Sequence, residues 1–266
     1  MDFDYQPFQP ILSDGGLQRF ELSLQQRPAT EILSGIVHSY LQVDTATPSL
    51  YPIIPDATQA VFFSPQGVMI GGAQTKAVDI PMLSAGEYFG IRFYPAALRY
   101  FFKLDLADIT DDFVDAKFFP CELFSSLQEE IYETQGFFQR TELCERWLLK
   151  HYVSSVKSDL IHAIALLYQH SGNIRIAHLS EQVGWSSRHL NRLFRLHTGL
   201  STKEFAQIIR LQQACKQLCY APSDYVGTAH DVGFYDQSHL NNDYKKRMLS
   251  SPSAFFNRFM SDFSNR

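Results

Sequence analysis

Four side chains in the C-terminal third of the chain could contact the edges of nucleic-acid bases. Asn191, Arg192 and Arg195 lie three, four and seven positions after Arg188, so a helix beginning near Ser187 would place them on one face. In the major groove of duplex DNA, arginine fits guanine and asparagine fits adenine. The same face could be only a solvated surface, so the interpretation depends on the elements that position it.

Two short helices joined by a turn are predicted around this face. Gly184 can adopt the left-handed conformation that ends a helix, and Ser186 is suited to cap the next one. Apolar residues recur at helical spacing on both sides of the turn. They are Ile176, Leu179, Val183, Leu190, Leu193 and Phe194. The pattern is typical of a helix-turn-helix.

An internal repeat supports this interpretation. The tripeptide 183–185 (Val-Gly-Trp) recurs 49 positions later as 232–234 (Val-Gly-Phe), and 189–191 (His-Leu-Asn) recurs 50 positions later as 239–241. The second turn is therefore one residue longer. The offset of 50 continues through the pairs Phe194 and Tyr244, Ser201 and Ser251, and Phe205 and Phe255. Two copies of one supersecondary unit explain this register.

The second copy has its own cap and its own polar face. Asp236 is the expected cap, and Leu240 and Tyr244 point inward. Side chains that could face a groove follow: Gln237, Ser238, His239, Asn241, Asn242, Lys245 and Lys246. Residues 203–218 predict one connecting helix, which would hold the two units at a fixed separation. Successive major grooves on one face of DNA are about 34 Å apart.

The whole chain predicts an α+β protein of two parts. Residues 1–121 consist largely of short β-prone runs broken by Pro, Gly and Asp, which favours an antiparallel sandwich or barrel for sensing or dimerisation. Residues 122–153 have helical periodicity and are expected to form a connector. Residues 157–266 predict an all-α domain of two helix-turn-helix units joined by a long helix, which we expect to fold and bind DNA by itself.

Charge is divided along the chain in the same way. From residue 172 onward there are 12 Lys and Arg against 7 Asp and Glu, a net charge of +5, whereas residues 1–171 have 11 against 21, a net charge of -10. A basic module on an acidic body indicates a polyanionic partner for the C-terminal part.

The sequence contains little that would indicate an enzyme or a metal-binding protein. The cysteines form no CxxC pair, and no catalytic motif, metal site or cofactor site is recognisable. Cys215 and Cys219, four apart on a predicted helix, could bind a metal or act in redox chemistry, but core packing is favoured. A DNA-repair alkyl acceptor would need a reactive thiol with a low pKa, and Cys121 and Cys144 offer no setting for one. A small-molecule enzyme with an appended DNA-binding module is the third alternative.

Residues 157–260 resemble the AraC/XylS family of transcription regulators. The motifs that carry the resemblance are 179–194, Gly199, Arg210 with Ala214, 233–234, 237–240, and Ser251-Pro252 followed by Phe255-Phe256. The resemblance implies two helix-turn-helix units on a long helix. It also implies base contacts from Arg188, Asn191 and Arg192 in the first unit and from Gln237, Ser238, His239 and Asn242 in the second.

The resemblance has departures, and a looser counterpart at the N-terminal end. Leu249 stands where the family usually has Gly, and Thr228 stands where it has an apolar residue. The N-terminal part is similar to an uncharacterised β-rich domain often found ahead of this module, through Pro55-Asp56, Gly72 with Thr75, 90–93 with Pro95-Ala96, and Leu106 with 109–111. There, Ala57 replaces a Gly often seen after Pro-Asp.

We expect a sequence-specific transcription regulator with double-stranded DNA as its partner. A small-molecule effector, RNA polymerase and a second copy of the chain are further partners to be tested, and no effector-binding residue can be named. Aromatic residues of the N-terminal part could line a pocket, although core packing is favoured: Tyr51, Phe62, Phe63, Tyr88, Phe89 and Phe93. No stretch approaches the roughly 20 apolar residues of a membrane span, and the first residues do not resemble a signal peptide, so we expect the cytoplasm.

Overall fold

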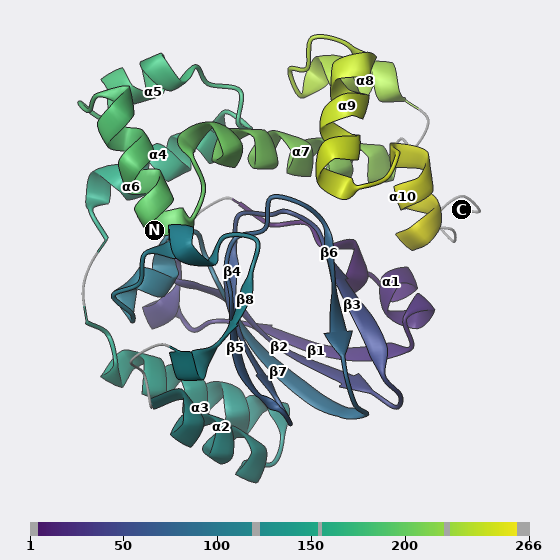
Figure 1. The fold of residues 1–266 in the computed structure, drawn as a ribbon, viewed down its shortest axis with the longest axis vertical. Coiled ribbons are helices and arrows are strands. Elements are labelled where there is room, and N and C mark those ends of the chain that lie inside the picture. The colour runs from purple at the N-terminus through teal and green to yellow at the C-terminus, as the bar shows by residue number, and fades with distance from the viewer. Residues whose placement is uncertain (1–4, 119–122, 154–155, 221–223, 260–266) are drawn as a thin grey trace.

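An antiparallel β-sheet region and a helical region make up the protein, as the sequence predicted. The computed structural model describes residues 5–118, 123–153, 156–220 and 224–259. Strands occur in the N-terminal part, and the C-terminal helices lie along one side of it (Figure 1). No helix in the described part of the chain is long and apolar enough to cross a membrane.

Six strands form the main sheet, and every neighbouring pair is antiparallel. In spatial order they are β1 (Leu22–Pro28), β2 (Val37–Thr45), β7 (Gly86–Phe93), β4 (Gln59–Ser64), β5 (Gly67–Gly71) and β8 (Phe113–Asp115). A second sheet consists of β3 (Ser49–Ile53) paired with β6 (Val78–Met82). The expected antiparallel β-rich domain is confirmed, and β3–β6 is an additional layer.

The two faces of the main sheet have different surroundings. Along β4, Val61 and Phe63 are fully buried in the largest core, whereas Phe62 between them is partly exposed. Along β7, Phe89 and Ile91 belong to that core, whereas Tyr88 does not. Successive side chains of a strand point to opposite faces, so one face is the core and the other faces β3–β6.

Two helices cover the core face of the sheet. They are α2 (Leu123–Glu133) and α3 (Phe137–Lys150), which correspond to the expected connector at 122–153. Phe124 and Trp147 stack on each other, and Phe124 also contacts Phe63 of β4. The helices therefore form a layer on the sheet, because their apolar faces are buried against it. Residues 119–122, including Cys121, lie outside the described residues.

Short helical segments fill the remaining N-terminal part. Before β1 come a 3₁₀ turn at Pro10–Leu12 and the helix α1 (Asp14–Arg19), which the sequence analysis did not foresee. Further 3₁₀ turns lie at Glu31–Leu33, Ala97–Tyr100, Leu106–Ile109 and Ala116–Phe118. The turn after Pro55-Asp56 is present with Ala57 at φ 63°, a left-handed conformation that usually requires glycine.

Seven helices of the C-terminal part are described: α4 (Ser158–Gln169), α5 (Ile176–Gln182), α6 (Ser187–Thr198), α7 (Thr202–Tyr220), α8 (Tyr225–Asp231), α9 (Gln237–Met248) and α10 (Pro252–Phe259). The predicted connecting helix at 203–218 is α7. Its 19 residues give a length of about 28 Å at about 1.5 Å per residue. In Figure 1, α7 runs between the pair α5–α6 on one side and the group α8–α10 on the other.

Candidate nucleic-acid interface

The turn between α5 and α6 has the geometry that the sequence predicted. Gly184 has φ 68°, and the Ser186 hydroxyl accepts a hydrogen bond of 3.2 Å from the His189 amide. An N-cap of this kind satisfies one backbone donor of the first turn, which fixes where the second helix begins.

The first polar face lies on α6. Ser187, Arg188, Arg192 and Arg195 are exposed, while the opposite face of the helix is buried. Asn191 is half-buried, and its side-chain oxygen accepts a 3.1 Å hydrogen bond from the Thr202 amide at the start of α7. The structure therefore brings the arginines together on the surface and gives Asn191 a capping contact, which leaves its amide donors for other partners.

The second polar face lies on α9. The Asp236 carboxylate accepts a 2.7 Å hydrogen bond from the His239 amide, which confirms the predicted cap. Exposed side chains follow along the helix: Gln237, Ser238, His239, Asn242, Lys245 and Lys246; Asn241 is half-buried. Asp243 and Arg247 are buried and pair with each other at 3.4 Å. The acidic Asp243 thus points inward and does not reduce the positive charge of the exposed face directly.

Aromatic contacts show the same geometry in both units. The rings of Phe194 and Phe205 are 5.3 Å apart at 78°, and those of Tyr244 and Phe255 are 5.6 Å apart at 79°. The Trp185–His189 and Phe234–His239 pairs are also alike, at 5.1 Å and 5.2 Å with nearly perpendicular rings. The internal repeat in the sequence is therefore a structural repeat.

A cluster around Gly233 joins the second turn to the first unit. Asn173, in the loop before α5, donates a 3.3 Å hydrogen bond to the Val232 carbonyl, and a Cβ atom on Gly233 would lie 1.6 Å from its side chain. The Arg210 guanidinium of α7 lies over the Phe234 ring at 4.4 Å. Arg210, part of the family motif, therefore holds the second turn against α7 rather than adding to an exposed face.

Both candidate recognition helices end against the sheet region. The carbonyl at the end of α6, that of Gly199, accepts a 2.7 Å hydrogen bond from the Thr110 hydroxyl. Near the end of α9, the Arg247 carbonyl accepts a 2.6 Å hydrogen bond from the Ala77 amide. The starts of both helices consequently lie on the side away from the sheet (Figure 1). In helix-turn-helix proteins the first residues of the recognition helix contact the bases.

One exposed aromatic residue was missed by the sequence analysis. Tyr235 is the extra residue of the longer second turn, directly before the Asp236 cap, and its side chain is 92% exposed. A tyrosine hydroxyl beside the start of α9 could donate to a phosphate. The repeat offset changes from 49 before the second turn to 50 after it, and this one-residue insertion is the sequence signal that could have identified Tyr235.

The described cysteines have no reactive setting. Burial raises the pKa of Cys219 to about 12, and burial also raises the pKa values of Cys144 and Cys215. Cys215 lies 3.8 Å from the Tyr244 hydroxyl inside a core. In the described ranges no group of three or more His, Cys, Asp or Glu residues could hold a metal ion. Cys144 and Cys215 are core residues, and Cys219 packs against the core that contains Cys215.

Comparisons with known proteins find a family match in each part of the chain. Residues 179–258 match the family described as "Helix-turn-helix domain", and residues 25–115 match the family described as "Domain of unknown function (DUF6597)". The C-terminal part is therefore a helix-turn-helix domain. It is of the AraC type, in agreement with the resemblance seen in the sequence.

The relatives are named as transcription regulators. The chain is 34% identical over 137 residues to the uncharacterized HTH-type transcriptional regulator YbfI of Bacillus subtilis, covering 46% of this chain and 50% of YbfI. It is 27% identical to the HTH-type transcriptional activator RhaS of Pectobacterium carotovorum, covering 28% and 30%. The chain thus matches at most half the length of either. A structure of ToxT from Vibrio cholerae aligns with 91% of this chain and 99% of its own, at 10% identity and a TM-score of 0.46.

Proposed function

We propose that the protein is a sequence-specific DNA-binding regulator of transcription that inserts α6 and α9 into successive major grooves. The observation that carries the proposal is the pair of exposed polar faces on α6 and α9, which are capped alike and joined by α7. Side chains with hydrogen-bond donors occupy both faces, and such side chains read base edges and phosphates. We infer that the protein works in the cytoplasm, as expected for a bacterial-type regulator of transcription.

The two faces differ in what they would contact. Arg188, Arg192 and Arg195 on α6 are suited to guanine and phosphate, and Asn191 keeps donors for adenine. On α9, Gln237, Ser238, His239 and Asn242 would face bases, and Lys245 and Lys246 would face the backbone. Tyr235 joins this second set as a phosphate contact.

The N-terminal part would modulate DNA binding by a small molecule or by self-association. Its net charge of -10 over residues 1–171 makes it an unsuitable surface for DNA. RNA polymerase and a second copy of the chain stay predicted partners. The alkyl-acceptor alternative is not favoured, because burial raises the pKa of each described cysteine. We infer that the protein is not an enzyme.

The direct test is binding of the full chain to duplex promoter DNA over a range of salt concentrations. Each neutralised phosphate should contribute about 0.9 to the slope of log affinity against log salt. Replacing Arg188, Arg192 and Arg195 with Ala should remove most of the affinity. The matched control replaces three exposed cations of the N-terminal part, Lys103, Arg146 and Lys150, and should leave affinity unchanged. A flat salt response, or equal losses in both triple variants, would refute the proposal.

A further inference from the structure

A cavity of about 420 Å³ lies between the main sheet and the β3–β6 sheet. Small-molecule sites in proteins commonly measure about 300–1,000 Å³. Its floor comes from the face of the main sheet that the core helices do not cover, and its other wall comes largely from β6. The principal side chains are Leu41, Val43, Phe62, Met69, Tyr88 and Phe113 on the main sheet and Val78, Ile80 and Met82 on β6.

The cavity is lined mainly by apolar side chains that remain partly exposed. Phe62, Met69 and Phe113 are half-buried, although the strand neighbours of Phe62 and Met69 on the opposite face are in the core. Apolar surface left uncovered in this way gains free energy when a ligand removes it from water. Of the aromatic residues considered for a pocket, Tyr51, Phe62 and Tyr88 line the cavity, and Phe63 and Phe93 are core residues. Phe89 belongs to the core and also borders the cavity.

Charge on the lining sets the class of ligand. Among the described residues around the cavity, the charged ones are Asp79 and Asp115, both carboxylates. Asp115 pairs with Lys117 at 2.6 Å and Asp79 with Arg258 at 2.7 Å, so each carboxylate is already balanced. No described lysine or arginine lines the cavity, so an anionic ligand would lose its hydration there without gaining an opposite charge. An uncharged, largely apolar molecule meets no such penalty.

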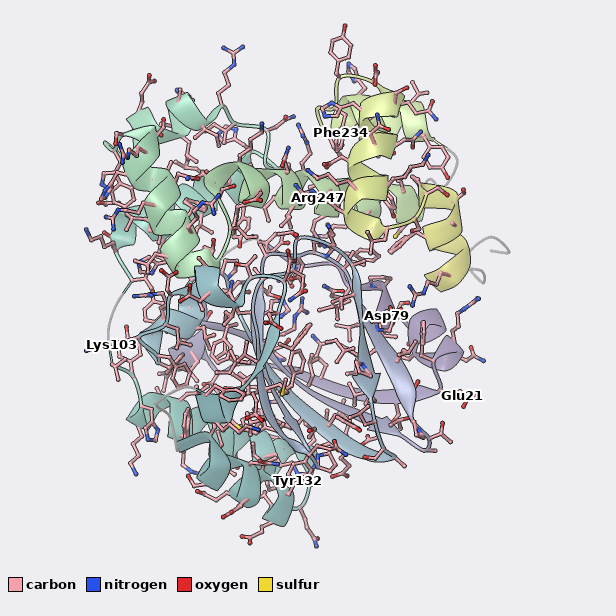
Figure 2. All side chains as sticks on the ribbon, viewed as in Figure 1. Glu21, Asp79, Lys103, Tyr132, Phe234 and Arg247 are labelled. Carbon is pink, nitrogen blue, oxygen red and sulfur yellow. The ribbon has the colours of Figure 1, made fainter. Side chains whose placement is uncertain are left out.

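The strand that covers the cavity also holds the second helix-turn-helix unit. Val78, Ile80 and Met82 line the cavity, while Asp79, between them on the strand, pairs with Arg258 of α10. Just before β6, the Ala77 amide donates to the Arg247 carbonyl, and the Arg247 guanidinium donates to the Thr75 carbonyl at 3.3 Å. Figure 2 labels Asp79 on the β6 side and Arg247 on the α9 side of the boundary between the β3–β6 sheet and the second unit.

Apolar packing connects the same two elements. Ile54, directly after β3, is buried in a core with Leu211 and Cys215 of α7 and Tyr244 of α9, and Ala77 packs against that core. One end of the β3–β6 sheet therefore packs against the core of the second unit through the residues that flank its strands. A ligand that shifts this sheet must change the packing of α7 and α9.

We propose that the cavity binds an uncharged, largely apolar small molecule and that β6 transmits its occupancy to α9 and α10. The binding site stands independently of DNA binding, whereas its regulatory consequence rests on the proposed function. A ligand that prefers one position of β6 changes DNA affinity, and by linkage DNA changes ligand affinity by the same factor.

Binding is tested on the full chain with two fluorescent probes that share one aromatic body. N-Phenyl-1-naphthylamine is uncharged, and 1-anilinonaphthalene-8-sulfonate has an added sulfonate. We expect the uncharged probe to bind at least tenfold more tightly. Gly90→Val should weaken it at least tenfold, because a Cβ there lies 3.6 Å from Phe62 and larger groups extend into the cavity. Met69→Trp fills the same space from β5 and should weaken probe binding as well. It is the second variant to be measured if Gly90→Val does not fold.

The matched control is Leu50→Phe on the outer side of β3, an exposed residue that does not line the cavity, and it should leave probe affinity unchanged. Equal affinity for the two probes would overturn the ligand class. Unchanged affinity in folded Gly90→Val and Met69→Trp would overturn the site.

Transmission is tested by measuring DNA affinity with and without saturating uncharged probe. We expect a change of about fivefold or more, the range of measured allosteric couplings. Arg258→Gln, which removes the pair with Asp79, should reduce this change while probe binding persists. A DNA affinity that the probe leaves unchanged would overturn the transmission. Failure of the proposed function is distinguishable, because the chain would then bind the probe and no DNA.

Discussion

The two helix-turn-helix units have the same internal geometry but different attachments to the rest of the molecule. Leu190 and Phe194 of the first unit belong to the large core that continues into the sheet. The second unit has two smaller cores, one of which includes Ile54 from the β3–β6 boundary. The first unit is thus fixed to the sheet region, whereas the second depends on the β3–β6 sheet for its position.

The ends of the two recognition helices differ in the same sense. Gly199 closes α6 at φ 81°, a conformation that glycine adopts without strain. Leu249 closes α9 at φ 56°, where its Cβ atom is strained, and its side chain is 65% exposed. The departure from the family noted in the sequence is therefore accommodated by a strained backbone rather than by a different turn. The comparison suggests that the second unit is the less stable one.

The largest expected effect concerns the attachment of the first unit. A Cβ atom on Gly199 would lie 2.6 Å from the Thr110 hydroxyl and 2.8 Å from the Leu106 carbonyl oxygen. Gly199→Ala should therefore lower the free energy of unfolding by about 2–4 kcal/mol, measured by urea denaturation. Gly184→Ala is the control, since it has φ 68° but no atom within 4 Å, and should cost only about 1–2 kcal/mol. Equal losses would mean that the contact with the sheet region is unimportant.

The next effect concerns base contacts of the first unit. Arg192→Ala should weaken binding to the specific site by about 1–3 kcal/mol and relax discrimination at one base pair, because a bidentate contact is lost. Competition binding against single-base variants of the site measures both quantities. A loss that is the same on specific and random DNA would reassign Arg192 to the backbone.

A smaller effect of opposite sign is expected at the end of α9. Leu249→Gly should raise the free energy of unfolding by about 1 kcal/mol, because relief of the left-handed strain exceeds the entropy that glycine adds to the unfolded chain. Urea denaturation of the full chain is the measurement. A lower stability in the variant would contradict a strained end to α9.

The smallest effect concerns the backbone contact of the second unit. Lys245→Ala should weaken specific and random DNA binding alike and lower the salt slope by about one. Lys103→Ala, an exposed lysine of the N-terminal part, serves as the control and should leave the slope unchanged (Figure 2). A change in sequence preference in Lys245→Ala would place this lysine at a base.

Features set by neighbouring residues could be predicted from the sequence. The caps at Ser186 and Asp236 and the left-handed Gly184 follow from local side-chain and backbone chemistry, and the repeat exposed the second unit. β1 and β6 could not be predicted from their own residues, since polar residues or a proline interrupt their apolar pattern. Their pairing depends on distant strands.

Contacts between distant elements were also beyond the sequence. Asn191 caps α7 only because α6 and α7 meet at a particular angle, and nothing near Asn191 in the sequence predicts this contact. The packing of α2 and α3 on the sheet is another such case, because helical periodicity identifies an apolar face but not what covers it. The cavity under β3–β6 arises in the same way.

The central claim is that the protein reads DNA with both units and principally with α6. A binding-site selection from random duplexes, carried out with the full chain and with Arg192→Ala and Asn242→Ala, tests it most directly. The account predicts one enriched sequence for the full chain, a loss of preference at one position for Arg192→Ala, and a smaller change for Asn242→Ala. No enriched sequence for the full chain would contradict sequence-specific binding, and a larger change for Asn242→Ala would make α9 the principal reader.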